Sequence, residues 1–297
     1  MILLTGANGF LGKNILHKVE RIYDIKTLSK SIGDYVFSLE KAIPNFNEKF
    51  KIVIHLAGVA HLSIDSENSR NVFHEVNVIG TKNLLTGLEM VGIPDQFIYV
   101  SSVAVYGKKF GSGINESSEL CAKDPYGRSK IDAERLVINW CNFNNVVCTI
   151  LRLPLVVGLN PPGNLGAMIK GIQKGYYFNI DDGKARKSMV LAEDIAKYIL
   201  KAGEVGGIYN LTDGYHPNFK ELSQLIAKQS GKDKVLNMPY LPAKIAAVIG
   251  NLVGKFAPLN TEKLIKITST LTFDDSKARA AFGWNPTHVL EGLKINS

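Results

Sequence analysis

The feature that most constrains the fold is a glycine-rich turn that begins at Thr5. The turn reads Thr5-Gly6-Ala7-Asn8-Gly9-Phe10-Leu11-Gly12 and lies between an apolar run, Ile2–Thr5, and a helical pattern over 11–20. Small residues in that position let the backbone approach a pyrophosphate, whose charge is met by free N–H groups at the start of the helix. The glycine spacing alone is common, but the strand before it and the helix after it favour a dinucleotide-binding unit over a tight structural turn.

The first half of the chain alternates apolar strands with helical patterns, which is typical of βαβ units around a parallel sheet. Further strands are expected at Ile25–Ser29, 51–56, 96–101 and 146–153, and helices at 73–90 and 126–141. Prolines and glycines then crowd 154–166, and we place a boundary near 158–162. We predict an α/β fold with a Rossmann-type doubly wound parallel sheet over 1–158, to which 188–212 returns. A smaller C-terminal substrate-binding lobe is expected over 159–297.

Composition narrows the class of protein. The 297 residues are 45% hydrophobic and 21% charged, which is ordinary for a globular chain and excludes disordered and fibrous classes. Cys121, Cys141 and Cys148 are an odd number without Cys-x-x-Cys spacing, so neither a disulfide framework nor a metal site is expected. No basic leader precedes the first strand, and with the cysteine pattern this favours a cytoplasmic protein.

The formal net charge of +8 admits two interpretations. A nucleic-acid partner would require clustered basic residues, but the lysines are scattered and no long basic run interleaves with aromatic residues. A polyanionic small substrate explains the charge as well. We therefore expect no nucleic-acid partner.

One apolar stretch, 245–254, lies between Lys244 and Lys255. A helix of about ten residues rises roughly 15 Å, about half of a bilayer core, so no transmembrane segment is expected. A buried or surface-docked helix is the favoured interpretation, and contact of this helix with one membrane face stays open as the alternative.

The end of the second predicted strand bears on the cofactor. A carboxylate there accepts both hydroxyls of the adenosine ribose and favours NAD, whereas basic and hydroxyl side chains accommodate the 2′-phosphate of NADP. The strand ends in Ser29-Lys30-Ser31, and Asp24 precedes the strand rather than ending it. These residues favour NADP(H) over NAD(H), with a solvated loop lysine as the alternative for Lys30.

Tyr126 and Lys130 are four residues apart and therefore share one face of a predicted helix. An ammonium and a nicotinamide ring nearby both favour the phenolate, so we expect the pKa of Tyr126 to be lowered toward working pH. Ser102 ends an apolar strand at the sheet edge where open α/β folds build ligand sites, although serines also end strands for structural reasons. Together the three residues predict proton transfer at a carbinol or ketone.

This ordered set of motifs is similar to that of the extended short-chain dehydrogenases/reductases of the NAD-dependent epimerase/dehydratase family. Besides the glycine turn, the matching segments are His55-Leu56-Ala57-Gly58, Asn77-Val78-Ile79-Gly80-Thr81, 101–107, 126–130, 151–158 and Phe282-Gly283-Trp284-Asn285-Pro286. They cover nearly the whole chain. Ser38 is a departure, since the family usually has an aspartate there that touches the adenine.

The resemblance implies roles for individual residues. Ser102, Tyr126 and Lys130 would be catalytic, and the last two would also touch the cofactor. The other cofactor-binding positions would be Gly6, Asn8, Gly9, Phe10, Leu11, Gly12, Ser29, Lys30, Leu56, Ala57, Gly58 and Asn77. Asn77 has a purely structural alternative, a bond to neighbouring backbone, and we assign no role to His55 or His61.

On the substrate side, Asn164 and Leu165 match the family's nucleotide-contacting segment, and Ser102 would hold the reacting oxygen. Arg186 and Lys187 lie where the family binds a phosphate through an arginine. The best alignment places Lys187 at that position, and lysine supplies charge without bidentate geometry. An exposed loop cation is the alternative for both residues, and Arg279 is a weaker candidate of the same kind.

The resemblance implies hydride exchange on a nucleotide sugar. Ser102-Val103-Ala104 lacks the acidic pair of a 4,6-dehydratase, and the pattern over 154–164 is similar to bacterial 4-keto-6-deoxy-sugar-nucleotide reductases of polysaccharide synthesis. We expect reduction of a UDP-linked 4-keto-6-deoxy-N-acetylhexosamine. The alternatives are a UDP-sugar 4-epimerase and a non-catalytic dinucleotide-sensing scaffold. The resemblance also implies a homodimer through the helices at 73–90 and 126–141.

Overall fold

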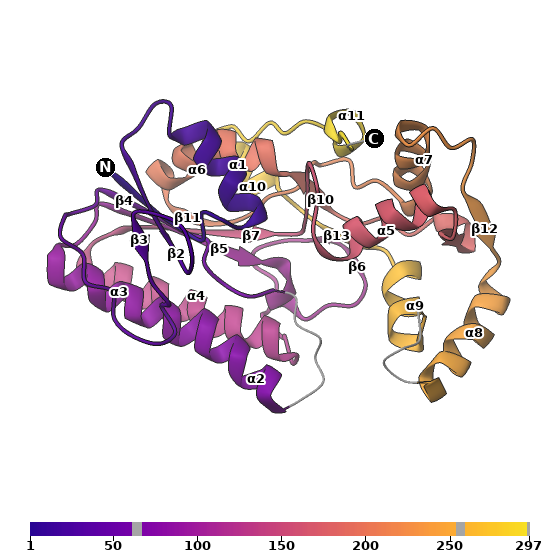
Figure 1. Ribbon diagram of the computed structural model, residues 1–297, viewed down its shortest axis with the longest axis horizontal. Helices are drawn as coiled ribbons and strands as arrows, with labels where there is room; N and C mark the ends of the chain where they lie inside the picture. The colour runs from indigo at the N-terminus through magenta and orange to yellow at the C-terminus, as the bar shows by residue number, and fades with distance from the viewer. Residues whose placement is uncertain (61–66, 254–258, 296–297) are drawn as a thin grey trace.

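The computed structural model describes residues 1–60, 67–253 and 259–295. Its centre is a seven-stranded parallel sheet in the order β11-β7-β5-β4-β1-β2-β3 (Figure 1). Its strands are β1 (Ile2–Thr5), β2 (Ile25–Ser29), β3 (Tyr35–Val36), β4 (Ile52–His55), β5 (Gln96–Ser102), β7 (Val147–Leu153) and β11 (Gly207–Asn210). The strand order reverses at β1, between β2 and β4, and open α/β sheets bind their ligands at such a switch point.

Helices cover both faces of this sheet (Figure 1). One face packs against α1 (Phe10–Val19) and α6 (Ala192–Val205), the other against α3 (Gly80–Val91) and α4 (Pro125–Asn144). Leu4 belongs to the first of these cores and Leu3 to the second, because successive side chains of a strand point to opposite faces. Burial on both faces explains why the first three residues of β1, Ile2, Leu3 and Leu4, are all apolar.

The remaining strands form three small parallel pairs. They are β6 (Gly111–Ile114) with β13 (Leu271–Phe273), β8 (Leu155–Val157) with β10 (Met189–Leu191), and β9 (Phe178–Ile180) with β12 (Leu236–Met238). Short helical turns lie at η1 (Glu75–Ile79), η2 (Val103–Tyr106) and η3 (Asp181–Gly183). The other helices are α2 (Glu67–His74), α5 (Gly163–Lys174), α7 (Phe219–Gln229), α8 (Tyr240–Val253), α9 (Thr261–Thr268), α10 (Ser276–Phe282) and α11 (Val289–Gly292). Figure 1 shows α5, α7, α8 and α9 gathered at the end of the molecule remote from α3.

The predicted fold class is confirmed, and the strands predicted at Ile2–Thr5 and Ile25–Ser29 match β1 and β2. The helix predicted over 73–90 lies within a longer helical run from α2 through the π-turn η1 to α3. The division into two lobes stays a prediction. Among the described residues, no helix is long and apolar enough to cross a membrane, and no group of His, Cys, Asp or Glu could hold a metal ion.

Candidate active site

The glycine turn packs directly against the loop that follows β4. Gly6 has a φ of +72°, and a Cβ atom there would lie 2.8 Å from the backbone N of Ala57. A Cβ atom on Gly12 would collide with the backbone O of Gly6. Gly9 is the N-cap of α1 and makes no side-chain cap hydrogen bond, so it offers only backbone at this helix start. The result is a backbone-lined cradle that fits a pyrophosphate.

Asn8 links the glycine turn to the end of β2. Its Nδ2 donates to Oγ of Ser29 at 2.8 Å and to the backbone O of Ile32 at 2.9 Å. Nζ of Lys30 lies 2.5 Å from Oε1 of Glu40. Burial is the largest influence on Glu40 and opposes its ionisation, but the hydrogen bond and charge of Lys30, with a backbone hydrogen bond and the charge of Lys41, together lower the pKa of this carboxyl. A cation and a carboxylate therefore lie side by side at the tip of β2. This arrangement is compatible with the ribose hydroxyls of NAD and with the 2′-phosphate of NADP.

Sequence reasoning missed Glu40 because it follows β3 and reaches Lys30 only in the folded chain. A hollow of about 410 Å³ adjoins this pair. It is lined by Lys30, Glu40, Val59, Asn71, Val72, Glu75 and Val76. Three valines offer apolar walls for a flat base, so this hollow is a candidate for the adenosine end of a dinucleotide. Asp24 precedes β2, as expected, and is absent from the lining.

A larger hollow, of about 990 Å³, lies along α1 and α6. Phe10 and Asn160 belong to its lining, but Ser102, Tyr126 and Lys130 do not. We therefore do not assign the chemistry to this hollow, since size without convergent reactive groups does not make an active site.

Lys130 is buried beneath the carboxyl edge of the sheet. Its Nζ donates to the Tyr99 hydroxyl at 3.1 Å and to the backbone O of Val100 at 3.0 Å. Burial lowers the pKa of Lys130 to about 8, against the opposing effect of the Glu134 carboxylate. An ammonium has three donors, and these two acceptors use two of them. Tyr99 is a further residue that sequence reasoning missed, because it lies on β5 and only the sheet brings it to α4.

Asn77 lies in the π-turn η1 and is fully buried. Its Oδ1 accepts from the backbone N of Val59 at 2.9 Å, and its Nδ2 donates to Oγ of Ser129 at 2.9 Å. A Cβ atom on Gly58 would lie 2.9 Å from this Oδ1 and 3.5 Å from Nζ of Lys130. Asn77 thus ties the loop after β4 to α4, a supporting role, and Gly58 keeps the space above Lys130 open. Single π-turns inside helices frequently occur at functional sites.

Tyr126 lies in the first turn of α4, whose start is fixed by the Asp124 side chain accepting from the backbone N of Gly127 at 2.9 Å. Ser102 at the end of β5 lies near enough to its hydroxyl to affect the pKa of this tyrosine. Burial raises the pKa of Tyr126, and the negative charge of Asp124 raises it further. The contact with Ser102 acts in the opposite direction. The predicted lowering by Lys130 is therefore wrong for the chain by itself, because that ammonium is turned to Tyr99 and Val100. The contribution of a nicotinamide ring stays a prediction.

A buried ion pair between Arg152 of β7 and Glu134 of α4 holds α4 against the sheet. Nη2 of Arg152 lies 2.7 Å from Oε2 of Glu134, and Oγ of Ser101 donates to the same carboxylate at 2.5 Å. Nη1 of Arg152 donates to the Tyr106 hydroxyl at 3.0 Å. This network links β5 and β7 to α4 and so fixes the helix that carries Tyr126 and Lys130.

His55 has a structural role. Its Nδ1 and Nε2 lie 2.6 Å from Oγ1 of Thr5 and 2.9 Å from Oγ1 of Thr81, and burial lowers its pKa to about 3, so the ring is neutral. His61 lies outside the described residues.

The predicted substrate-side residues have different environments. Asn164 is exposed in the first turn of α5, whereas the Leu165 side chain is buried in the core between α5 and α7. Only the backbone of Leu165 can face a ligand. Arg279 forms an ion pair with Asp275 at 2.7 Å, and this pairing explains the arginine without a substrate.

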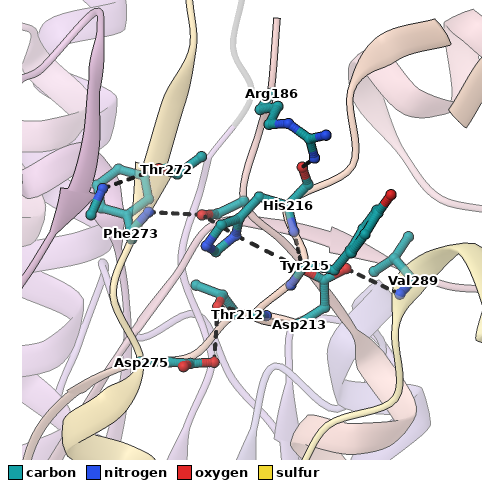
Figure 2. Close-up of polar contacts among 12 residues, drawn as sticks. Arg186, Thr212, Asp213, Tyr215, His216, Thr272, Phe273, Asp275 and Val289 are labelled. Carbon is teal, nitrogen blue, oxygen red and sulfur yellow. Dashed lines mark hydrogen bonds and ion pairs between the residues drawn. The ribbon is translucent and has the colours of Figure 1, made fainter. Parts of the chain in front are cut away.

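Arg186 and Lys187 are adjacent in sequence but have different partners. Nη1 of Arg186 donates to the backbone O of His216 at 2.9 Å, and the guanidinium lies 5.6 Å from the ring centroid of Tyr215 (Figure 2). Lys187 is half-buried, and within the described part of the chain no hydrogen bond or ion pair of its ammonium is found. Burial lowers the pKa of Lys187 to about 8, and the nearby charge of Lys266 adds to this. An anion would relieve that cost, so Lys187 is the stronger phosphate candidate.

Figure 2 also shows a polar cluster around His216, in which Oγ of Ser188 lies 3.0 Å from its Nδ1. This Ser188 oxygen accepts from the backbone N of Phe273 at 2.8 Å and is buried. Asp213 accepts from the backbone N atoms of His216 and Val289 at 2.9 and 3.1 Å. The cluster joins β10, β13 and α11 and is structural, since its serine is enclosed.

Comparison with known proteins now decides the family. The family model described as "NAD dependent epimerase/dehydratase family" matches residues 2–212, most of the chain. The chain belongs to this family. The predicted resemblance and the expectation of an enzyme are thereby confirmed.

Other proteins resemble this enzyme over almost all of its length, both in sequence and in structure. It is 28% identical, over 98% of this chain and 92% of the relative, to an Escherichia coli O157:H7 protein named N-acetyl-alpha-D-glucosaminyl-diphospho-ditrans,octacis-undecaprenol 4-epimerase. It is 25% identical to the UDP-glucose 4-epimerase of Vibrio cholerae, over 99% of this chain and 93% of the relative. The structure of RMD from Pseudomonas aeruginosa with NADPH shares the fold with a TM-score of 0.74 at 19% identity, over 98% and 97% of the two chains.

Proposed function

We propose that this enzyme exchanges hydride between a nicotinamide cofactor and carbon 4 of a nucleotide sugar, with Tyr126 moving the proton of the oxygen on that carbon. The observation that carries the proposal is that Ser102, at the end of β5, lies near enough to the Tyr126 hydroxyl to lower its pKa against the effect of burial, while Lys130 lies one turn further along α4. Ser102 would hold the substrate oxygen, and Tyr126 would give or take its proton. Lys130 would orient the cofactor and favour the Tyr126 phenolate once the cofactor is bound.

The residues present fit a dinucleotide, since Gly6 and Gly12 put backbone rather than side chains beside the start of α1, and a Cβ atom at either position would collide with neighbouring backbone. The bound cofactor supplies the nicotinamide ring that accepts and returns hydride. Gly6, Gly9 and Gly12 would hold its pyrophosphate, and Lys130 would donate to the ribose beside the nicotinamide.

In its finer form the proposal is that the substrate is a UDP-linked 4-keto-6-deoxy-N-acetylhexosamine and that NADPH reduces it, for bacterial polysaccharide synthesis. Ser102-Val103-Ala104 lacks the acids of a dehydratase, so the keto sugar would be made by another enzyme. Lys30 would release Glu40 and meet the 2′-phosphate, while Asn164 and Lys187 would contact the nucleotide and its diphosphate. A structural relative solved with NADPH supports this cofactor.

The second candidate is a 4-epimerase, which the names of both sequence relatives favour. An epimerase oxidises carbon 4, lets the keto sugar turn, and returns hydride to the opposite face. Ser102, Tyr126 and Lys130 serve both reactions, so these residues do not separate the two.

Incubation with each substrate class tests both candidates. We expect stoichiometric consumption of NADPH with the 4-keto-6-deoxy sugar nucleotide, and loss of this activity in Tyr126→Phe. Interconversion of UDP-sugars without added cofactor would overturn the reductase and establish the epimerase. A functional Tyr126→Phe variant in cells would overturn both and favour the dinucleotide-sensing scaffold.

We further propose that the enzyme works in the cytoplasm as a homodimer through α3 and α4. Met90 on α3 and Phe143 on α4 are large, exposed apolar side chains, which a contact between copies would cover. Sedimentation of the double variant Met90→Ser/Phe143→Ser tests this, since we expect it to be monomeric.

A further inference from the structure

Helix α8 buries its small side chains and exposes its large apolar ones, which is the reverse of an ordinary surface helix. Its buried positions are small, namely Ala243, Ala247 and Gly250. Its large apolar side chains are exposed: Tyr240, Leu241, Ile245, Val248, Ile249 and Leu252. A helix that packs only against its own chain buries its large apolar side chains and exposes its polar ones.

The exposed side chains form one continuous stripe. Leu241, Ile245, Val248, Ile249 and Leu252 follow the four-and-three spacing that places residues on one helical face. Leu252 is 88% exposed and Leu241 is 70% exposed. Single exposed apolar residues are ordinary, but a contiguous row of them marks an interaction surface. We call this row the α8 stripe.

The fold holds the stripe outward. The small face of α8 packs in a minor core with Leu264 of α9, and with Ile180 and Met238 from β9 and β12. Figure 1 shows α8 at the extreme end of the molecule, beside α9 and away from the seven-stranded sheet. Turning the stripe inward would require the helix to abandon the close approach that Ala243 and Ala247 allow.

Charge around the stripe identifies its partner. Between Asp233 and Glu262 the sequence has no acidic residue, and it has three cations, Lys234, Lys244 and Lys255. Lys244 lies on α8 and is exposed at the flank of the stripe. Glu262, on the adjoining α9, is paired with Lys266 at 2.9 Å. An apolar face with Lys244 at its flank and no acidic residue on its own helix is complementary to an anionic lipid surface. A second copy would bring Lys244 toward the same charge on its partner, which disfavours self-association.

We propose that the α8 stripe inserts into the boundary between headgroups and acyl chains of an anionic lipid bilayer, so that the enzyme binds one membrane face. The helix has 14 residues, and no described helix could span the bilayer, so the contact is peripheral. The adjoining helix α9 carries Lys266, whose charge acts on Lys187. The substrate-side cation therefore belongs to the end of the molecule that meets the lipid. This inference does not rest on the proposed reaction.

Vesicle flotation of the full chain tests the inference. We expect the protein to float with vesicles of phosphatidylcholine and phosphatidylglycerol, and to do so less with phosphatidylcholine alone or at high salt. Ile245→Ser/Leu252→Ser should lower the apparent partition coefficient roughly tenfold or more, because two large apolar groups are lost from the contact. Lys244→Glu should lower binding to the anionic vesicles by a smaller factor.

A matched control replaces two apolar side chains that are exposed elsewhere, Ile22→Ser/Val205→Ser, and should leave flotation unchanged. Equal flotation of the α8 variant and the control would overturn the inference. So would failure of the wild-type chain to float. Concentration-dependent dimers that disperse in Ile245→Ser/Leu252→Ser without any vesicle binding would overturn it too, and would assign the stripe to a second copy. Turnover of a water-soluble substrate should be the same in all these variants.

Discussion

Lys130 is a buried cation and Lys187 a half-buried one from a different region, and burial lowers the pKa of both to about 8. Around Lys130, the Tyr99 hydroxyl and the Val100 carbonyl hold the ammonium, and the Glu134 carboxylate favours its charge. Around Lys187, no acceptor is found among the described residues, and Lys266 disfavours the charge further.

The difference teaches that the same pKa arises from two kinds of environment. The chain alone already satisfies Lys130 and fixes it in place, as expected of a group that must be oriented during catalysis. Lys187 bears an uncompensated cost that only a bound anion would remove, as expected of a ligand-binding cation. The following predictions separate the two environments, beginning with the largest effect.

Tyr126→Phe tests whether the Lys130 region is catalytic. We expect kcat to fall at least about a hundredfold, because removal of a general acid/base usually costs that much. Tyr35→Phe removes a hydroxyl that bonds Asn47 and Glu48 far from the site and should keep full activity. Steady-state kinetics with the substrate found for the wild-type chain checks both variants, and equal rates in all three proteins would remove Tyr126 from the mechanism.

Replacing each lysine by methionine should affect a different kinetic constant. Lys130→Met should lower kcat by about a hundredfold, whereas Lys187→Met should raise KM by about tenfold and leave kcat nearly unchanged, the size of one charge-assisted contact. Lys184→Met, an exposed neighbour paired with Asp182, is the control and should change neither constant. A large loss of kcat in Lys187→Met would contradict the division of roles.

The pH dependence of UDP binding should depend on Lys187. The ammonium loses its proton as pH rises through about 8, so we expect the Kd for UDP to increase several-fold above that pH. Lys187→Arg should bind UDP with little change over the same range, because arginine keeps its charge. Titration calorimetry without cofactor measures this, and an identical pH profile in both proteins would show that another group titrates.

Thermal stability should change in opposite directions. The folded pKa of Lys187 is below its unfolded value, so its penalty is fully present below pH 8 and is relieved as pH rises toward the unfolded pKa of about 10.4. Lys187→Met should therefore raise stability at neutral pH by about 1 kcal/mol, or roughly 2–4 °C in Tm. Lys130→Met should lower it by about 1–3 kcal/mol, because Tyr99 and Val100 lose their donor. Calorimetry at pH 7 decides between these signs.

Local patterns in the sequence predicted much of the molecule. The apolar runs and their turns predicted the strands Ile2–Thr5 and Ile25–Ser29, because the first is buried throughout and followed by glycine, and the second is buried at Leu28 and Ser29, where it ends. The order of glycine turn, Ser102, Tyr126 and Lys130 predicted that these groups share one sheet edge, since parallel strands end at the same side. Helical spacing placed Tyr126 and Lys130 on one face of α4.

Contacts between distant segments were beyond that reasoning. The Tyr99 hydroxyl reaches Lys130 across the sheet, and Glu40 reaches Lys30 from the loop after β3. The expected lowering of the Tyr126 pKa by Lys130 was wrong for the chain without a cofactor, because the direction depends on where the Lys130 ammonium points, which periodicity does not encode. The π-turn at Asn77 likewise arises from the bonds of its amide to Val59 and Ser129.

By itself, the sequence determined the Rossmann fold and the family and predicted Tyr126 and Lys130 as the proton-handling pair, because these depend on short-range spacing and on the order of motifs. Only the tertiary structure decided which of Arg186 and Lys187 is left without an acceptor among the described residues, and which face of α8 is turned outward. Both are outcomes of packing: His216 takes the arginine, and Ala243 with Ala247 takes the inner face of α8. The glycine turn at Thr5 identifies the fold from the sequence alone. Burial in the folded chain determines which charged and apolar side chains stay available to bind a partner.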